Sequence, residues 1–296
     1  MGSHGGRRMA DRTIVKQLRI SREKARALGE QTVAILSAGY YITESGVRVD
    51  IRRQVDAAVR GTVSYPPGKT PLGVSTRQGA TMVEVRNETT LAAARALTAS
   101  GLQTAALNFA SATTPGGGFL QGARAQEEYL ARSSALWACL RDNPMYAHHR
   151  AQRHPFYTDY VLHSPDVPVL RDDDGVLLEE PYLCSIITSP AVNAFQVWRY
   201  APERISEISP VMKTRILKVL AVAIEHGHEA IVLGAWGCGA FGNDAGEIAN
   251  LFRNALEADF RGAFERVVFA VADWSEDERF IGPFLRAFGG GQVRFA

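Results

Sequence analysis

The sequence has few cysteines and no long apolar run. Its three cysteines, Cys139, Cys184 and Cys238, are an odd number, and no two of them have CxxC spacing. This pattern argues against a disulfide framework and against a zinc site, so we expect a reducing cytoplasm and no metal or other cofactor. No apolar stretch approaches the roughly 20 residues of a membrane span, so we expect no membrane association. We interpret residues 1–9 as a tag-like arm and not as a signal peptide, because no apolar segment follows them.

The sequence also lacks a large excess of positive or negative charge. The formal net charge is +2, and the basic residues are scattered among acidic ones. A protein that holds nucleic acid through its phosphates usually carries a concentrated basic stripe, so we expect no direct nucleic-acid binding. Arginine dominates over lysine, which favours a few directed contacts to phosphate or carboxylate groups. A small anionic ligand therefore fits the composition better than a duplex.

The length and the pattern of the first quarter suggest one large domain with an extension. The chain has 296 residues, of which 46% are hydrophobic, enough for a sizeable core. We expect a helix over residues 19–35 with Ser21 as its N-cap, a short strand over 40–42 and a second helix over 49–59. Residues 65–73 are rich in turn formers. We therefore place a tag-like arm and a helical extension in residues 1–75, and the main domain in residues 76–296.

In the main domain, predicted strands alternate with predicted helices. The strands are expected at residues 81–85, 104–109, 158–162, 167–170, 183–188, 230–233 and 267–271. The helices are expected at residues 91–98, 126–140, 211–225, 245–260 and 276–288, and residues 143–180 are otherwise irregular. This alternation predicts an α/β fold, a three-layer α/β/α arrangement with a mostly parallel or mixed sheet between helices.

Two glycine-rich loops follow predicted strands, at residues 110–122 and 234–244. Without a Cβ, glycine allows backbone amides to approach an anion closely, and a helix N-terminus after each loop adds unpaired N–H groups. Tight chain reversal alone would explain one such loop. Because two occur at strand-to-helix junctions, we expect them to hold a diphosphate from both sides. Neither is a P-loop, and the GxGxxG letters at residues 237–242 are a weak match to a dinucleotide fingerprint.

An acid pair, Glu127 and Glu128, begins the helix that follows the first loop. Acidic residues in a first helical turn commonly match the helix dipole. Beside a phosphate-binding loop, however, a glycosidic acid/base becomes plausible. Neighbours on a helix project about 100° apart, so we expect the two carboxylates to touch two adjacent sugars.

The triple glycine Gly116–Gly118, the seven residues 119–125 and the run Gln126-Glu127-Glu128 together resemble the GGG…QEE signature of poly(ADP-ribose) glycohydrolases, in their compact bacterial-type branch. The resemblance covers about residues 76–288. It implies a macrodomain-like fold with an N-terminal helical extension. It also implies hydrolysis of the ribose–ribose O-glycosidic bonds of poly(ADP-ribose), which releases ADP-ribose. From the same resemblance we expect ADP-ribosylated proteins as partners, a monomeric state and a role in the DNA damage response.

The resemblance also implies roles for individual residues. Glu128 matches the catalytic acid, and Glu127 matches the neighbour that orients the adjacent ribose. Asn108 ends a strand near the terminal ribose. The substrate-binding residues implied in the two loops are Gly116, Gly117, Gly118, Gln126, Gly237, Cys238, Gly239, Ala240, Phe241 and Gly242. Residues 85–89 and 272–274 are positional candidates for the adenine pocket.

The implied mechanism uses one carboxyl group twice. Protonated Glu128 donates to the departing ribose oxygen, an oxocarbenium-like centre develops on the other ribose, and ionised Glu128 then activates water. A helix N-terminus opposes protonation of a carboxylate. We expect the negative charges of Glu127 and of the bound pyrophosphate to favour the protonated form.

Three other functions remain open, one of which is a purely structural or interaction role. A macrodomain that binds ADP-ribose without cutting it would share the glycine loops but would not need the acid pair. A hydrolase of mono-ADP-ribose on protein side chains could use the same site if its second ribose subsite were poorly formed.

Several other residues have ordinary interpretations. His226 and His228 favour capping of a helix C-terminus, His148 and His149 favour solvated positions, and residues 172–174 favour a solvated aspartate turn. Residues 198–200, Trp-Arg-Tyr, could stack a base or a second ADP-ribose unit, or could be a simple surface or core cluster.

Overall fold

The structure is a computed structural model that describes residues 20–73, 75, 77, 79–152 and 154–295. The expected tag-like arm at residues 1–9 lies outside the described residues. The main sheet is built from β3 (Val63–Tyr65), β4 (Thr81–Arg86), β5 (Thr104–Phe109), β6 (Val161–Arg171), β7 (Leu177–Ser189), β8 (Ala230–Leu233), β9 (Arg266–Ala270) and β10 (Gln292–Phe295). Among the described residues, no helix combines the length and the apolar character needed to cross a membrane.

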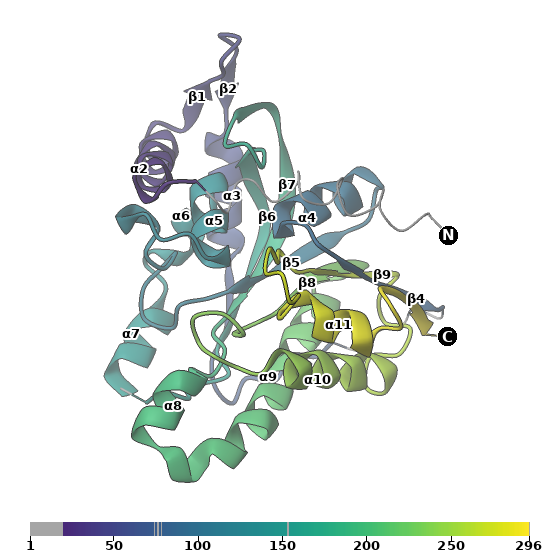
Figure 1. The fold of residues 1–296 in the computed structure, drawn as a ribbon. Helices are drawn as coiled ribbons and strands as arrows, with labels where there is room; N and C mark the ends of the chain where they lie inside the picture. The colour runs from purple at the N-terminus through teal and green to yellow at the C-terminus, as the bar shows by residue number, and fades with distance from the viewer. Residues whose placement is uncertain (1–19, 74, 76, 78, 153, 296) are drawn as a thin grey trace.

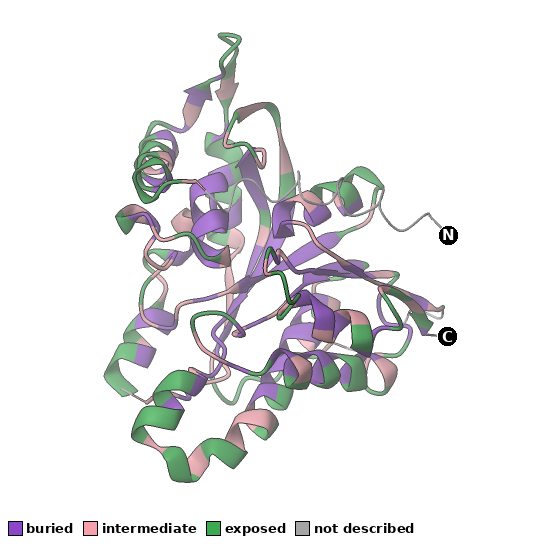
Figure 2. Cartoon of the chain, in the orientation of Figure 1, coloured by how far each residue is buried: buried purple, intermediate pink, exposed green. Residues whose placement is uncertain are grey.

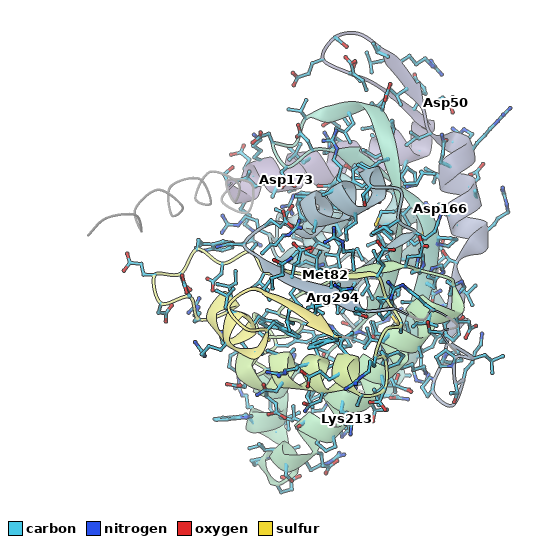
Figure 3. The ribbon with its side chains drawn as sticks, turned by 90° about the vertical axis from the view of Figure 1, so that its right-hand side faces the viewer. Asp50, Met82, Asp166, Asp173, Lys213 and Arg294 are labelled. Carbon is cyan, nitrogen blue, oxygen red and sulfur yellow. The ribbon has the colours of Figure 1, made fainter. Side chains whose placement is uncertain are left out.

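The eight strands lie in the order β10-β4-β9-β8-β5-β7-β6-β3 (Figure 1). The five central strands, from β4 to β7 in this order, are parallel. Antiparallel strands complete both margins: β10 pairs with β4, and β6 and β3 follow β7. Met82 of β4 is in register with Arg294 of β10, and Figure 3 shows the two side by side at one margin. The prediction of a mixed sheet is confirmed.

Helices cover both faces of the sheet. They are α2 (Arg22–Ala38), α3 (Arg52–Gly61), α4 (Thr90–Ala99), α5 (Gln126–Ser133), α6 (Leu136–Leu140), α7 (Pro144–Gln152), α8 (Ala194–Tyr200), α9 (Ile208–Glu225), α10 (Ala245–Glu257) and α11 (Ile281–Ala287), with 3₁₀ turns at Phe119–Gln121 and Pro202–Glu207. In the view of Figure 1, α3 to α6 lie above the sheet, and α9, α10 and α11 lie below it. This is the expected three-layer α/β/α arrangement.

Two hydrophobic cores separate the layers. Alternate residues of a strand point to opposite faces, so Ile231 and Leu233 of β8 join the core under α9 to α11, whereas Ala230 and Val232 join the core under α3 to α6. The central strands are therefore buried on both faces, as Figure 2 shows by their purple colour. Such strands are continuous apolar runs, which is why the sequence indicates them clearly.

The N-terminal extension is tied to the main sheet. Helix α2 begins after Ser21, whose side chain accepts a hydrogen bond from the Lys24 amide (3.0 Å), as expected of an N-cap. A two-stranded sheet of β1 (Tyr40–Ile42) and β2 (Arg48–Asp50) follows. Residues 63–65, which we expected within the extension, form β3 and pair with β6. The extension is thus built into the same sheet as the rest of the chain.

The structure differs from the predicted elements mainly between residues 126 and 200. The single helix expected over 126–140 is broken into α5 and α6, because Ser134 is extended and forms a bridge to Val169. The segment expected to be irregular contains α7, and the short strands expected at 158–162, 167–170 and 183–188 overlap two longer antiparallel strands, β6 and β7. Helix α8 and strand β10 were not predicted. The break after Ser133 and strand β10 depend on partners distant in the sequence, whereas β6 and β7 form a hairpin with each other.

Candidate active site

A pocket opens beyond the carboxyl ends of the parallel strands. Residues that follow β4, β5, β8 and β9 line it, as expected for ligands of an open α/β sheet. The segments at the pocket are 88–90 after β4, 109–111 after β5, 124–129 at the start of α5, 235–241 after β8, and 270–274 with Phe280 after β9. Ala191, which follows β7, completes the wall.

Gln126 fixes the start of α5 against β5. Its side-chain oxygen accepts from the Phe109 amide (2.9 Å), and its side-chain nitrogen donates to the Leu107 carbonyl (2.7 Å) and to Thr90 Oγ1 (3.1 Å). An amide side chain with both ends bonded has one orientation. Gln126 therefore holds the following acid pair in place, in addition to lining the pocket.

Both oxygens of Glu127 are bonded to the protein. Its Oε2 accepts from the Ser111 amide (2.6 Å), and its Oε1 accepts from Asn108 Nδ2 (3.4 Å). Burial raises the pKa of Glu127 to about 8, and the charge of Glu128 adds to the increase, whereas the donors of Ser111, Asn108 and Gly116 oppose it. Glu127 thus carries a proton near neutral pH more readily than an ordinary glutamate.

Glu128 is bonded at one oxygen and open at the other. Its Oε1 accepts from the Gly118 amide (2.9 Å), whereas its buried Oε2 has no hydrogen-bond partner among the described residues. The residue lines the pocket. A buried carboxylate oxygen without a donor is costly unless it is protonated or meets a ligand. Oε2 of Glu128 is therefore the carboxyl oxygen of the pair that is available for proton transfer.

The two carboxylates converge, which differs from our expectation that they project apart. A Cβ placed on Gly117 would lie 2.2 Å from Glu128 Oε1 and 3.0 Å from Glu127 Oε2. Gly117 also has φ +59°, a conformation that favours glycine. Helical side chains lean toward the N-terminus, so both acids at the first turn reach back to the preceding loop. Glycine is therefore needed at position 117 to make room for the carboxylates.

The amides of the first loop are largely occupied. Those of Ser111 and Gly118 bind the acid pair, and that of Gly117 donates to the Thr114 carbonyl (3.0 Å). Gly116, Gly117 and Gly118 are not among the residues that line the pocket, and neither is Asn108, which bonds to Glu127 and Thr188. Their direct contact with a substrate stays a prediction. In the structure these four residues support the acid pair.

The second loop presents unpaired amides to the pocket. Gly239, Ala240 and Phe241 line the pocket, and within the described residues their N–H groups donate no hydrogen bond. Such a group of free amides is a typical anion site. The loop is anchored from behind by the buried Trp236, which donates to the Ser189 carbonyl (3.2 Å), and by Asn243, which donates to the Val192 carbonyl (2.8 Å).

The other second-loop residues have separate places. Gly237 lines the pocket. Cys238 is buried and its thiol donates to the Trp236 carbonyl, and Gly242 packs against the Phe195 ring. Burial raises the pKa of the Cys238 thiol. Cys238 and Gly242 therefore shape the loop, and their direct contact with a substrate stays a prediction.

One end of the pocket is formed by the loops after β4 and β9. Glu88, Thr89, Ala272, Trp274 and Phe280 line it. The loops are tied together because Asn87 Nδ2 donates to the Asp273 carbonyl (2.6 Å) and the Asp273 amide donates to Asn87 Oδ1 (3.0 Å). The segments that we considered for an adenine pocket thus lie together after β4 and β9, and Thr89 also accepts a hydrogen bond from the Tyr129 hydroxyl of α5 (3.3 Å).

Asp173 is a supporting residue that sequence reasoning missed. We expected residues 172–174 to form a solvated turn, but Asp173 accepts hydrogen bonds from Thr89 (2.7 Å) and from the Tyr129 hydroxyl. It lies beside the start of α4 (Figure 3). Burial raises its pKa. The run of three aspartates gave no signal, because the contact depends on the β6–β7 hairpin folding back over α4.

Helix α7 braces the first loop, which also corrects an expectation. His149, expected to be solvated, is buried and bonds to the Ala112 carbonyl (3.2 Å), and Arg150 donates to the Thr113 carbonyl (2.6 Å). Burial lowers the pKa of His149 to about 4, so its ring is neutral.

No group of three or more His, Cys, Asp or Glu side chains in the described part of the chain could hold a metal ion.

Comparisons with known proteins identify relatives of this arrangement. The family model described as the microbial-type PARG catalytic domain matches residues 29–172. A crystal structure of poly(ADP-ribose) glycohydrolase from Thermomonospora curvata is 48% identical, with a TM-score of 0.86, and covers 90% of this chain and 100% of that one. The same enzyme bound to the inhibitor ADP-HPD is 47% identical over the same shares, with a TM-score of 0.83.

A more distant relative agrees with these matches. The structure of poly(ADP-ribose) glycohydrolase from Deinococcus radiodurans in complex with ADP-ribose is 42% identical, with a TM-score of 0.74, and covers 79% of this chain and 96% of that one. The comparison with curated proteins gave no match. The identity and coverage are high enough to show the family, so this chain belongs to the microbial-type poly(ADP-ribose) glycohydrolases and is a glycohydrolase.

Proposed function

We propose that this chain hydrolyses the ribose–ribose bonds of poly(ADP-ribose) with Glu128 as the proton donor and acceptor. The observation that carries the proposal is the contrast within the acid pair. Both oxygens of Glu127 accept hydrogen bonds, whereas Oε2 of Glu128 is buried at the pocket without a partner among the described residues. A macrodomain that only binds ADP-ribose would not need this open carboxyl group.

The order of strands supports one direction for the ligand. Loops after β4 and β9 offer an aromatic end with Trp274 and Phe280, which suits adenine. The free amides of Gly239, Ala240 and Phe241 follow β8 and suit the diphosphate. The acid pair follows β5, the next strand along, and suits the terminal ribose. The three subsites therefore follow one another along the sheet, as the parts of ADP-ribose do.

The reaction then needs one shuttled proton. Glu128 donates its proton to the oxygen that leaves with the rest of the polymer, and the carbon–oxygen bond to the terminal ribose breaks as an oxocarbenium-like centre forms. Arg132 lies one turn later on α5 and is buried, so its charge stabilises the Glu128 carboxylate at this stage. That carboxylate accepts a proton from water as the hydroxide adds to the sugar, which regenerates the acid and releases ADP-ribose.

Glu128→Gln tests the assignment. This variant keeps the size of the side chain and removes the transferable proton, so we expect turnover of poly(ADP-ribose) to fall by roughly 10²–10⁴-fold while calorimetry shows ADP-ribose binding close to the wild-type affinity. Glu44→Gln, at an exposed glutamate of the β1–β2 turn, is the matched control. Wild-type turnover by Glu128→Gln would show that another group transfers the proton.

We extend the proposal to the setting in which the enzyme works. Three cysteines with free thiols suit a reducing cytoplasm, and we include a monomeric state in the proposal. The net charge of +2 gives no general attraction to nucleic acid. Membership of the family supports ADP-ribosylated proteins as partners and a role in the DNA damage response.

A further inference from the structure

Helix α8 exposes large aromatic side chains beside the pocket. Phe195 is 59% exposed and Trp198 is 66% exposed. Together with Arg199 they occupy positions i, i+3 and i+4, so they share one face of the helix. We call these three residues the α8 stripe. Much of α8 is green in Figure 2, in agreement with these exposures. A cluster of exposed aromatic side chains in a folded domain commonly marks a binding surface.

The α8 stripe is continuous with the second loop. The Phe195 amide donates to the Phe241 carbonyl (3.1 Å), and the Phe195 ring lies so close to Gly242 that a Cβ there would approach it to 2.7 Å. Phe241 itself lines the pocket. Figure 1 shows α8 below the loop that leaves β8. The pocket wall thus passes through Phe241 directly into the stripe.

The sheet order places α8 on the side from which the polymer would leave. The proposed subsites run from β4 and β9 through β8 to β5, where the acid pair lies. The next strand is β7, and α8 follows β7 in the chain. A polymer that continues past the terminal ribose in the same direction would meet α8 next.

We infer that the α8 stripe binds the second ADP-ribose unit of the polymer, with a base stacked on Trp198 and a phosphate near Arg199. Aromatic faces stack bases without regard to sequence, and a guanidinium matches phosphate oxygens. The Arg199 guanidinium lies 5.3 Å from the centroid of the Tyr200 ring and forms no ion pair with a described acidic residue, so its charge is available to a phosphate. This inference rests on the proposed function, because it assumes that a terminal ADP-ribose occupies the pocket.

A comparison of two ligands tests the inference. In the Glu128→Gln background, calorimetry would measure the affinity for ADP-ribose and for its dimer, with chromatography to check that the dimer stays intact. We expect the dimer to bind more tightly than the monomer. We expect Trp198→Ala to weaken binding of the dimer by about tenfold and to leave binding of the monomer unchanged.

Ile205→Ala is the matched control, because Ile205 is also an exposed apolar residue (39%) and lies in the 3₁₀ turn that follows α8, outside the stripe. It should change neither affinity. If Trp198→Ala binds the dimer as tightly as its parent while ADP-ribose still binds, the stripe serves another partner, such as a protein surface, and the inference is wrong. If ADP-ribose itself fails to bind to a folded protein, the proposed function fails and the inference fails with it.

Discussion

At the residue scale, the glycine next to the acid pair has a steric role. Substitution of Gly117 by alanine would place a methyl group 2.2 Å from Glu128 Oε1, and the carboxylate would have to move. A displacement of about 1 Å at a reacting group can reduce the rate roughly 100-fold. We therefore expect Gly117→Ala to lose about that factor in polymer turnover, measured as release of ADP-ribose.

A control separates the clash from backbone strain. Gly227 has a similar positive φ of +72°, but a Cβ there would meet nothing within 4 Å. Gly227→Ala should thus lose stability by about 1–2 kcal/mol without loss of turnover. Equal turnover by the two variants would mean that room for the carboxylates does not matter.

The raised pKa of Glu127 makes stability depend on pH. Burial raises this pKa from 4.5 to about 8, so between these values the folded protein holds a proton that the unfolded chain has lost. Stability contributed by the protonated state is therefore lost as pH rises through this window, by up to about 1.4 kcal/mol per pH unit. Glu127→Gln should flatten that decline in urea unfolding measured from pH 5 to pH 8. An unchanged slope would show that Glu127 titrates normally.

At the element scale, the β6–β7 hairpin supports the pocket through Asp173. Its carboxylate bonds to Thr89 and Tyr129, which both line the pocket, and Thr89 also caps α4. We expect Asp173→Ala to lower the free energy of unfolding by about 1.5–3 kcal/mol and to weaken ADP-ribose binding, measured by calorimetry. The neighbouring Asp174 is exposed, so Asp174→Ala should change stability by less than about 0.5 kcal/mol. Similar losses in both variants would contradict this role.

The elements also show what could be predicted from sequence. Strands β5 and β8 were predicted with the observed bounds, because strands buried on both faces are continuous apolar runs. The acid pair and both loops were found because their motifs are local. Parts of β6 and β7 were predicted as shorter strands, whereas β10 was not predicted, because it is defined by its pairing with the distant β4. The contacts of Asp173 and His149 likewise cross long stretches of chain. Such contacts leave no local pattern.

At the scale of the whole molecule, a histidine cluster lies where β6 meets the α9–β8 connection, away from the pocket residues. His163 Nε2 lies 2.8 Å from His228 Nε2, and its ring stacks on His226 at 3.6 Å between centroids. We had expected His226 and His228 only to cap a helix. In the structure they also contact His163 and form a cluster with it. Burial lowers the pKa of His163 to about 2 and that of His228 to about 4.

This cluster should make the folded protein sensitive to acid. Below pH 6.5 the histidines of the unfolded chain bind protons, whereas the buried rings of the folded protein stay neutral. The free energy of unfolding therefore falls as pH decreases toward the pKa values of the folded protein. Each such ring contributes up to about 1.4 kcal/mol per pH unit. We expect His163→Gln to reduce the slope of unfolding free energy between pH 4 and pH 6.5. Because the cluster and the pocket share no residue, ADP-ribose affinity at pH 7 should be unchanged, and a large change would argue against their separation.

The margins of the sheet have a consequence for how the protein behaves when concentrated. The outermost strands, β3 with three residues and β10 with four, are short and antiparallel to their neighbours. β3 covers only residues 161–163 of β6, and the outer edge of β6 beyond it is interrupted where Ser134 forms a bridge to Val169. Short and interrupted rims are poor templates for edge-to-edge growth. Strand-mediated self-association, and the fibrils that can follow from it, are therefore disfavoured by the way this sheet ends.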